Sequence, residues 1–561
     1  MKPTLTHSLL AALLLAPLAS LPAADAPKPS ASFDDIAKLA SNKPSGAPLA
    51  PILDPGPEFA DDKRIIQNQP NIAVSPNGRI WLTWDTGGRF EGDREATNYS
   101  VLFTSGDGGK TFQGPVAVAR SPREARVMLS TVWIDPKGRL WWYYYAHGGT
   151  VANIAEDPEA AKPRFQAPFY VTSGFFGNKP AVLADGSWFW IAENSYPALG
   201  FHGLTFYRSK DDGKSFSFVG SFKFKPNKDP GHLTPGEPWA VELRDGRIAL
   251  FLRTAAGAEK AISADGGRTW GDAEPLQKEI RAVAFVRFFV QRLQSGNLLL
   301  VTNRVPEGPD PLATKGPLVN LRQYRERTHM TAWLSEDDGV TWKGGLRLDD
   351  RDSPSYSPDE SPFRRLDKLT TSPCGDQTKD GTIWLTYDLG RYGADAREIV
   401  VARIQEADVL AGKVVSPDSR LKICANKLTT PRHDYIPINP GNPKDPDHYT
   451  PNAMLINRLL RFEPAEQPDG IFKLQPRLGD LKGLETDLFT LRGPIHFKSQ
   501  LKDGVQEITL APPAHVKLTV IVPDYATGKT VPLTAGTVRD DGWRELPLTP
   551  GQATSVRIPL K

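Results

Sequence analysis

The octapeptide Ser263-Ala-Asp-Gly-Gly-Arg-Thr-Trp270 combines an aspartate, two glycines and a threonine, a pattern that either binds a ligand or stabilises a turn. An aspartate can accept hydrogen bonds from the backbone N–H groups of its own turn, and glycine permits positive φ. The same spacing recurs in three other segments: Ser105-Gly-Asp-Gly-Gly-Lys-Thr-Phe112, Ser209-Lys-Asp-Asp-Gly-Lys-Ser-Phe216 and Ser335-Glu-Asp-Asp-Gly-Val-Thr-Trp342. Four copies of one motif are not four active sites, so we predict that these four boxes are structural turns.

A second pattern occurs six times: a short turn that ends in glycine, followed by an apolar strand. Its glycines are Gly78, Gly138, Gly186, Gly246, Gly296 and Gly381. Most intervals between them are roughly 50 to 60 residues, which suits a unit of four antiparallel strands. Six such units predict an all-β fold, a six-bladed β-propeller, with the boxes at one corner of blades one, three, four and five.

Composition limits the classes of partner. The 561 residues carry 68 basic and 65 acidic side chains, a formal net charge of +3, and the two signs are interspersed along the chain. This balance predicts neither nucleic-acid binding nor a membrane-surface patch. The first 26 residues combine Lys2, an apolar run and small residues, as in a cleaved secretory signal, so we expect a secreted or periplasmic protein without a membrane span.

The domain organisation follows from these patterns. After the signal peptide (1–26) we expect an N-terminal extension (27–59), the propeller (60–412), a proline-rich linker or loop segment (413–460) and a C-terminal β-rich domain (461–561). Segments of the last domain, such as 515–522 and 553–560, alternate like half-exposed strands, which predicts a small β-sandwich-like domain.

The boxes, of the form Ser-x-Asp-x-Gly-x-Thr-Trp, resemble the Asp-box (BNR) repeats of the sialidase, or neuraminidase, superfamily. The resemblance covers roughly residues 60 to 412. Within this range, segments 236–243, 287–293 and 388–399 resemble segments of bacterial secreted sialidase-like proteins. It implies an exo-acting glycoside hydrolase without a cofactor that releases a terminal, acidic sugar such as sialic acid from glycans.

The resemblance also implies site residues. Glu237 matches the sialidase glutamate, and Arg253 and Arg327 match two arginines that grip the substrate carboxylate. Arginine suits this task because its planar fork donates bidentate hydrogen bonds. Glu91 or Asp93, in the loop after the second strand of blade one, matches the place of the acid/base aspartate.

Two family positions differ in this chain. The first carboxylate-binding arginine is replaced by the stretch Gln67-Asn-Gln-Pro70, and Ser372 stands at the place of the nucleophilic tyrosine. Further candidates follow from the residue types. His232 lies near Glu237 in sequence and Tyr324 precedes Arg327, so both are predicted to contact substrate. Other possible acids, bases or nucleophiles are Tyr145, Tyr196, His147 and His202.

Several alternatives stay open. The chain is a hydrolase of this type, a non-catalytic glycan-binding propeller, or a hydrolase or lyase for another acidic sugar. The histidines show no metal-site spacing, so no metal is expected. Cys374 and Cys424 are the two cysteines, and their separation leaves open whether they form a disulfide.

Overall fold

The computed structural model describes a chain that is almost entirely strand and turn. It covers residues 32–87, 98–122, 126–224, 236–254, 257–276, 280, 282, 286–304, 327, 329–349, 369–391, 397–428, 459–460, 471–479, 481–490, 493–514, 516–528 and 536–560. The helices in these ranges are α1 (Phe33–Ala40), α3 (Glu406–Ala411) and three single 3-10 turns, Pro57–Phe59, Asp61–Lys63 and Pro197–Leu199. The predicted all-β class is confirmed.

Six consecutive antiparallel sheets, called sheets one to six below, make up the first part of the chain. In each sheet four strands follow one another in chain order, and β1 (Ile52–Leu53) adds an outer strand to sheet one. The strands are β2 (Gln67–Val74), β3 (Ile80–Thr86), β4 (Tyr99–Ser105) and β5 (Gln113–Ala119) in sheet one; β6 (Met128–Ile134), β7 (Leu140–Ala146), β8 (Gly149–Ala155) and β9 (Phe169–Ser173) in sheet two; β10 (Ala181–Val182), β11 (Trp188–Tyr196), β12 (Phe201–Ser209) and β13 (Ser217–Lys223) in sheet three; β14 (Gly236–Glu242), β15 (Ile248–Thr254), β16 (Gly257–Ser263) and β17 (Glu274–Pro275) in sheet four; β18 (Phe289–Arg292), β19 (Leu298–Asn303), β20 (Met330–Ser335) and β21 (Lys343–Arg347) in sheet five; and β22 (Thr370–Gln377), β23 (Ile383–Leu389), β24 (Arg397–Ile404) and β25 (Arg420–Leu428) in sheet six.

The glycine turns lie where the sequence pattern predicts them, between the first and second strands of each sheet. Gly78 has φ +92° and Gly246 has φ +83°, a conformation that favours glycine. Each turn leads into a second strand that is buried on both faces, as the apolar runs require. In β3 and β23 every residue is buried.

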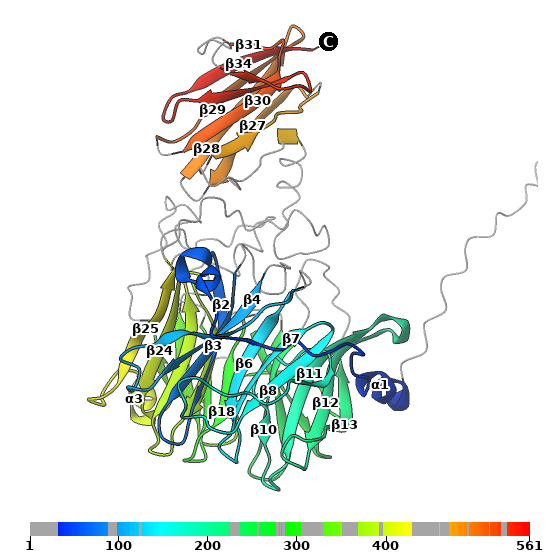
Figure 1. The fold of residues 1–561 in the computed structure, drawn as a ribbon, viewed down its shortest axis with the longest axis vertical. Helices are drawn as coiled ribbons and strands as arrows, with labels where there is room; N and C mark the ends of the chain where they lie inside the picture. Colours follow the sequence, from blue (N-terminus) through cyan, green and yellow to red (C-terminus); the bar gives the residue numbers. More distant parts are fainter. Residues whose placement is uncertain are drawn as a thin grey trace, which may run out of the picture.

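Neighbouring sheets pack face to face through large side chains. Trp142 of sheet two donates its indole N–H to Thr83 Oγ1 of sheet one at 2.9 Å. Sheets one and six are also in contact, because the backbone N–H of Val74 donates to Asp376 Oδ2 at 2.9 Å and Trp384 packs in one core cluster with residues of β3. Figure 1 shows the yellow strands β24 and β25 beside the blue strands β2 and β3.

The boxes are turns, as predicted. In the opening motif, Asp265 accepts the backbone N–H of Thr269 at 2.9 Å and its hydroxyl at 2.5 Å, while Ser263 Oγ accepts the N–H of Gly267 at 2.8 Å. Asp107, Asp211 and Asp337 repeat the arrangement. Ser263 pairs with Ile248, at the start of β15, so each box lies at the end of its sheet where the second strand begins.

A second unit follows residue 460. Its two sheets have the strand orders β26-β30-β33-β32 and β27-β28-β29-β34-β31, and both contribute side chains to one hydrophobic core. Their strands are β26 (Ile471–Leu474), β27 (Gly483–Thr490), β28 (Gly493–Lys502), β29 (Val505–Ala511), β30 (Lys517–Pro523), β31 (Thr527–Gly528), β32 (Thr537–Val538), β33 (Trp543–Leu548) and β34 (Thr554–Pro559).

The six-sheet unit differs from the sequence estimate at its C-terminal boundary. We expected it to end at residue 412, but β25 (Arg420–Leu428) is the fourth strand of sheet six. In this edge strand exposed residues alternate with half-buried or buried ones, so it lacks the continuous apolar run that identifies the inner strands.

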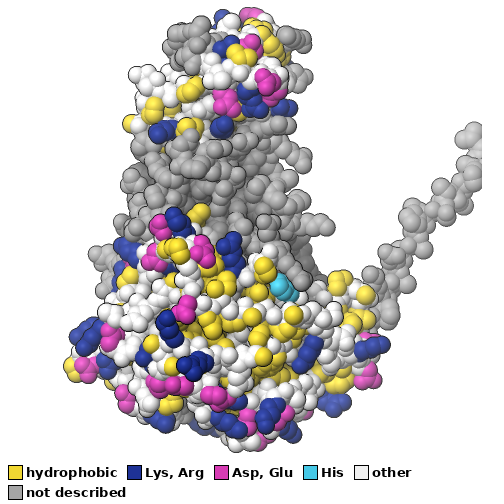
Figure 2. Space-filling view, in the orientation of Figure 1, with side chains coloured by type: hydrophobic (Ala, Val, Ile, Leu, Met, Phe, Trp, Pro, Cys, Tyr) yellow, Lys and Arg dark blue, Asp and Glu magenta, His cyan; other side chains and the backbone are white. Residues whose placement is uncertain are grey.

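The molecular surface is mixed in charge. Figure 2 shows basic and acidic side chains interspersed over the visible face, as the composition predicts. Among the described residues, no helix is both long and apolar enough to cross a membrane.

Candidate functional site

The second strands of the six sheets each carry a polar side chain or tyrosine at the same level. Counting seven residues from each turn glycine reaches Asp85, Tyr145, Glu193, Arg253, Asn303 and Asp388. This level lies at the end of the sheet opposite the boxes. In sheet four, Arg253 is five residues along β15 from Ile248, roughly 17 Å at about 3.4 Å per residue.

A β-bulge on the first strand of four sheets faces this level. Its central residue is left-handed although it is not glycine, with φ +54° at Gln69, +53° at Leu129, +49° at Glu237 and +52° at Ser372. Such a conformation costs of order 1 kcal/mol or more, so the surroundings must hold it in place. A bulge also turns a side chain away from the regular alternation of the strand.

Carboxylates of a neighbouring sheet hold three of these bulges. Asp85 Oδ2 accepts the backbone N–H of Leu129 at 2.7 Å, and Asp388 Oδ2 accepts that of Gln69 at 3.0 Å. In the same way the carboxylate of Glu193 accepts the backbone N–H of Glu237. We call this repeated contact the carboxylate clasp.

A cavity of about 280 Å³ opens at this level. Glu193, Glu237 and Arg253 lie on its wall together, and the other lining residues are Gln69, Arg126, Met128, Leu129, Phe175, Gly177, Asn178, Lys179, Ile191 and Pro238. We call it the mouth cavity. Two carboxyl groups and an arginine therefore converge on one small space.

Glu237 and Arg253 form an ion pair across β14 and β15. Arg253 Nη1 lies 3.0 Å from Glu237 Oε2, and both side chains are mostly buried, with 16% and 18% of their surface exposed. The strand register explains the contact, because Gly236, next to Glu237, pairs directly with Arg253. The arginine orients the Glu237 carboxylate, since opposite charges attract at this distance.

The surroundings of Glu193 favour its protonated form more than those of an exposed carboxyl group do. Burial raises the pKa of this carboxyl to about 7, with a further rise from the charge of Glu237, against the lowering effects of Arg253 and of the Glu237 N–H. Glu193 therefore holds a proton for part of the time near neutral pH. A carboxyl group of this kind can act as a general acid.

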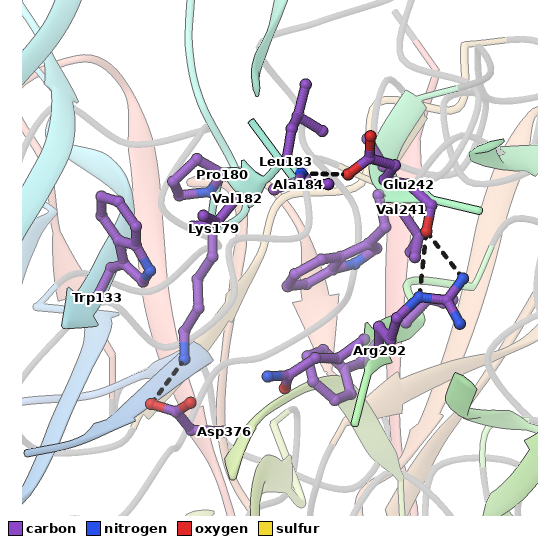
Figure 3. Close-up of a pocket in the computed structure, with 16 residues that line it drawn as sticks. Trp133, Lys179, Pro180, Val182, Leu183, Ala184, Val241, Glu242, Arg292 and Asp376 are labelled. Atoms are coloured by element: carbon purple, nitrogen blue, oxygen red, sulfur yellow. Dashed lines mark hydrogen bonds and ion pairs between the residues drawn. The ribbon is translucent and has the colours of Figure 1, made fainter. Parts of the chain in front are cut away.

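Lys179 joins the mouth cavity to a second cavity of about 450 Å³ between the first strands (Figure 3). Its Nζ lies 3.4 Å from Asp376 Oδ2 and donates to the carbonyl of Gly375 at 2.9 Å. The Asp376 carboxylate thus offsets much of the lysine charge. Arg292 in the second cavity donates to the backbone carbonyl of Glu242 at 2.8 Å.

The structure brings together two of the predicted site residues, Glu237 and Arg253. Arg327 is buried elsewhere, beside sheet six, where its carbonyl accepts the backbone N–H of Thr370 at 2.7 Å, and it does not line the mouth cavity. Glu91, Asp93, His232 and Tyr324 lie outside the described residues.

Ser372 occupies a bulge of sheet six and is 3% exposed. Its hydroxyl accepts a hydrogen bond of 2.7 Å from Arg391 Nη2, which also donates to Asp388 Oδ2 at 2.6 Å. The serine is thus bonded to a cation, and the described residues provide no base at its hydroxyl, so its surroundings do not activate it as a nucleophile.

The other candidate acids and nucleophiles have structural contacts. Tyr196 stacks on Phe201, with ring centroids 5.7 Å apart, and Tyr145 packs edge-on against Phe175. His147 Nε2 is bonded to Ser121 Oγ at 2.8 Å. Burial lowers the pKa of His202, which packs against Phe224. None of these four side chains lines the mouth cavity.

The described residues contain neither a metal-binding cluster nor a disulfide. Within the described ranges, no group of three or more His, Cys, Asp or Glu side chains could hold a metal ion. Cys374 is buried and Cys424 is exposed, and both are free thiols, so the disulfide left open by the sequence is not formed.

Glu193, Lys179 and the carboxylate clasp were not found from the sequence. A signal existed for Glu193, because the residue seven positions after each turn glycine lies at the level of Arg253. No such counting identifies Lys179, since it precedes the short strand β10 and reaches the cavity only through the packing of sheets three and six.

The chain is similar to a known family, to curated proteins and to solved structures. Residues 55–361, more than half of the chain, match the family described as BNR repeat-like domain. A sialidase of Vibrio cholerae, from two serotype O1 strains, is 29% identical over 161 residues, which are 25% of this chain and 19% of the relative. The chain thus spans about a fifth of the length of the curated relatives it matches.

Among solved structures, a protein of unknown function from Dyadobacter fermentans is 14% identical, with a TM-score of 0.42, over 58% of this chain and 91% of the other. A Hadza microbial sialidase is also 14% identical, with a TM-score of 0.43, over 59% of this chain and 65% of the other.

Proposed function

The chain belongs to the BNR repeat-like domain family, and we propose that its six sheets close into a six-bladed β-propeller that binds glycans at the mouth cavity. Two hydrogen bonds between sheets one and six support the closure, from Val74 to Asp376 and from Gln69 to Asp388. The two packed sheets after residue 460 fit the β-sandwich-like domain expected there.

The proposed activity is that of an exo-acting glycoside hydrolase, which releases a terminal acidic sugar of the sialic acid type. The convergence of Glu193, Glu237 and Arg253 on one cavity carries this proposal. Glycoside hydrolysis usually requires two carboxyl groups, and an arginine can bind the carboxylate of an acidic sugar. A volume of about 280 Å³ suits one sugar residue and not a long chain.

In this scheme Glu237, oriented by its ion pair with Arg253, polarises the water that attacks the anomeric carbon. The planar guanidinium of Arg253 has a donor geometry that matches the carboxylate of an acidic sugar. We also propose that the protein is exported, on the strength of the signal-like segment 1–26.

A non-catalytic glycan-binding protein is the second candidate. The surroundings of Ser372 favour it, because the tyrosine that sialidases use is replaced by a serine bonded to Arg391. A binding protein would keep Arg253 for recognition and would not need a nucleophile.

Incubation with a panel of aryl glycosides separates these candidates. The panel includes an aryl sialoside, aryl uronides and neutral aryl glycosides, and release of the aryl alcohol is followed by absorbance. Release from an acidic glycoside supports the hydrolase. Saturable binding without release supports the binding protein, and an unsaturated sugar absorbing in the ultraviolet would indicate a lyase.

A further inference from the structure

The three carboxylate clasps share a position but differ in their surroundings. Asp85 also accepts hydrogen bonds from Ser100 Oγ at 2.8 Å and Ser130 Oγ at 3.2 Å. Asp388 also accepts from Thr371 Oγ1 at 2.5 Å and from Arg391. Both aspartates are fully buried and neither lines the mouth cavity. These two clasps are sufficiently hydrogen-bonded to serve structure alone.

The Glu193 clasp is built differently. Its side chain is one methylene longer than that of aspartate, and it lines the mouth cavity. Its carboxylate lies against Gly236, where an added Cβ would approach Glu193 Oε2 to 2.7 Å. A glycine at this position therefore leaves the space that the carboxyl group occupies.

The charges around Glu193 come from the sheet packed against it. Arg253 on β15 and Glu237 on β14 face it, and these two are already paired at 3.0 Å. Arg126 and Lys179 are the other charged groups on the cavity wall, and Lys179 Nζ lies 3.4 Å from Asp376 Oδ2. The arginine that faces Glu193 is thus already paired with Glu237, which agrees with the raised pKa of Glu193.

We propose that Glu193 is the proton donor of the reaction, the group that protonates the glycosidic oxygen as the bond from this oxygen to the anomeric carbon breaks. This inference rests on the proposed hydrolase function. The leaving group departs as an alcohol carrying the proton of Glu193. Water adds to the anomeric carbon and loses its proton to Glu237. Release of that proton to solvent and uptake of one by Glu193 restore both carboxyl groups, so one water is consumed.

A series of sialosides with different leaving groups tests this role. A good leaving group such as dinitrophenol departs without protonation, whereas an alkyl alcohol requires it. Glu193→Gln is expected to lose about 10²-fold or more in kcat/KM with the alkyl sialoside and less than about tenfold with the dinitrophenyl sialoside. With the alkyl sialoside, the wild-type kcat/KM is expected to fall as pH rises through about 7. This fall is expected to be absent with the dinitrophenyl sialoside and absent in Glu193→Gln with either substrate.

Asp85→Asn is the matched control, because it alters a clasp at the same register position away from the cavity. It is expected to lower stability and to affect both substrates equally. Equal losses with both leaving groups in Glu193→Gln would overturn the inference and leave the hydrolase intact. A leaving-group dependence found in Asp93→Asn or Glu91→Gln and not in Glu193→Gln would also overturn it. Absence of turnover by the wild-type protein would overturn the proposed function and this inference together.

Discussion

Arg253 Nη1 lies 3.0 Å from Glu237 Oε2, and the pair is placed by the register of β14 and β15 and by the bulge that turns Glu237 into a left-handed conformation. The same bulge presents the backbone N–H of Glu237 to Glu193 on sheet three. One irregularity in one strand therefore positions both the ion pair and the second carboxyl group.

Arg253→Lys tests the need for a planar guanidinium. Lysine retains the charge but cannot offer parallel N–H groups to both Glu237 and a sugar carboxylate. We expect kcat/KM to fall about 10²- to 10³-fold on an acidic aryl glycoside. Arg247→Lys is the control, because this residue pairs with Asp245 at the other end of the sheet and is half exposed. An equal loss in both variants would contradict the assignment.

Gly236→Ala tests whether the position of the Glu193 carboxyl group matters for catalysis. The new Cβ would lie 2.7 Å from Glu193 Oε2, and the flexible side chain is expected to move aside while the fold persists. The reaction should slow mainly for poor leaving groups, with the thermal midpoint little changed. Gly271→Ala is the control, because its added Cβ would lie 3.6 Å from the carbonyl oxygen of Ile262, an ordinary van der Waals contact. Unchanged kinetics in Gly236→Ala would show that the position of Glu193 is irrelevant.

Asp265→Asn tests the structural role of the boxes. Burial opposes ionisation of Asp265, but hydrogen bonds from Thr269, Ser263 and Arg268 outweigh it and lower the pKa to about 2. The charged form therefore contributes stability above the unfolded pKa of about 4, and this is lost as pH falls toward about 2. We expect urea unfolding at pH 7 to show a loss of about 1 kcal/mol, because the exposed site is screened by water.

Urea unfolding at low pH tests the predicted direction of the change in stability with pH. The difference between wild type and Asp265→Asn should shrink as pH falls below 4, while kcat/KM at pH 7 stays the same in both. Asp157→Asn, at an exposed turn outside the boxes, serves as the control. A large loss of activity in Asp265→Asn without unfolding would contradict the structural role.

The two thiols should differ in reactivity. Cys424 is exposed and Cys374 is buried, and burial raises the pKa of both thiols. An aromatic disulfide reagent should modify one thiol in the native protein and two after denaturation, without prior reduction. Failure of the denatured protein to react before reduction would indicate that a disulfide had formed.

The repeated turn glycines and boxes made the strands and turns of the six sheets predictable from the sequence. The turn glycines locate the second strand of each sheet, and the aspartates of the boxes make the turn contacts expected of them. The edge strand β25 was missed because it lacks an apolar run. Patterns of this kind report burial, and an edge strand is only partly buried.

The candidate site was predictable only within one sheet. Glu237 and Arg253 face each other because their strands are adjacent, so counting along the chain sufficed. Glu193 reaches them from sheet three, and Arg327 turns out to be buried beside Thr370. Contacts between sheets depend on how the sheets pack, which the spacing of residues in a single sequence does not give.

Hydrolysis of an aryl sialoside at pH 7 by the wild type and by Glu237→Gln shows whether the Glu237 carboxylate takes part in catalysis. Glutamine keeps the shape of the side chain but removes the charge that pairs with Arg253. The account predicts release of the aryl alcohol by the wild type and a loss of about 10²-fold or more in the variant, with a folded protein by circular dichroism. Equal rates in the two proteins would contradict it.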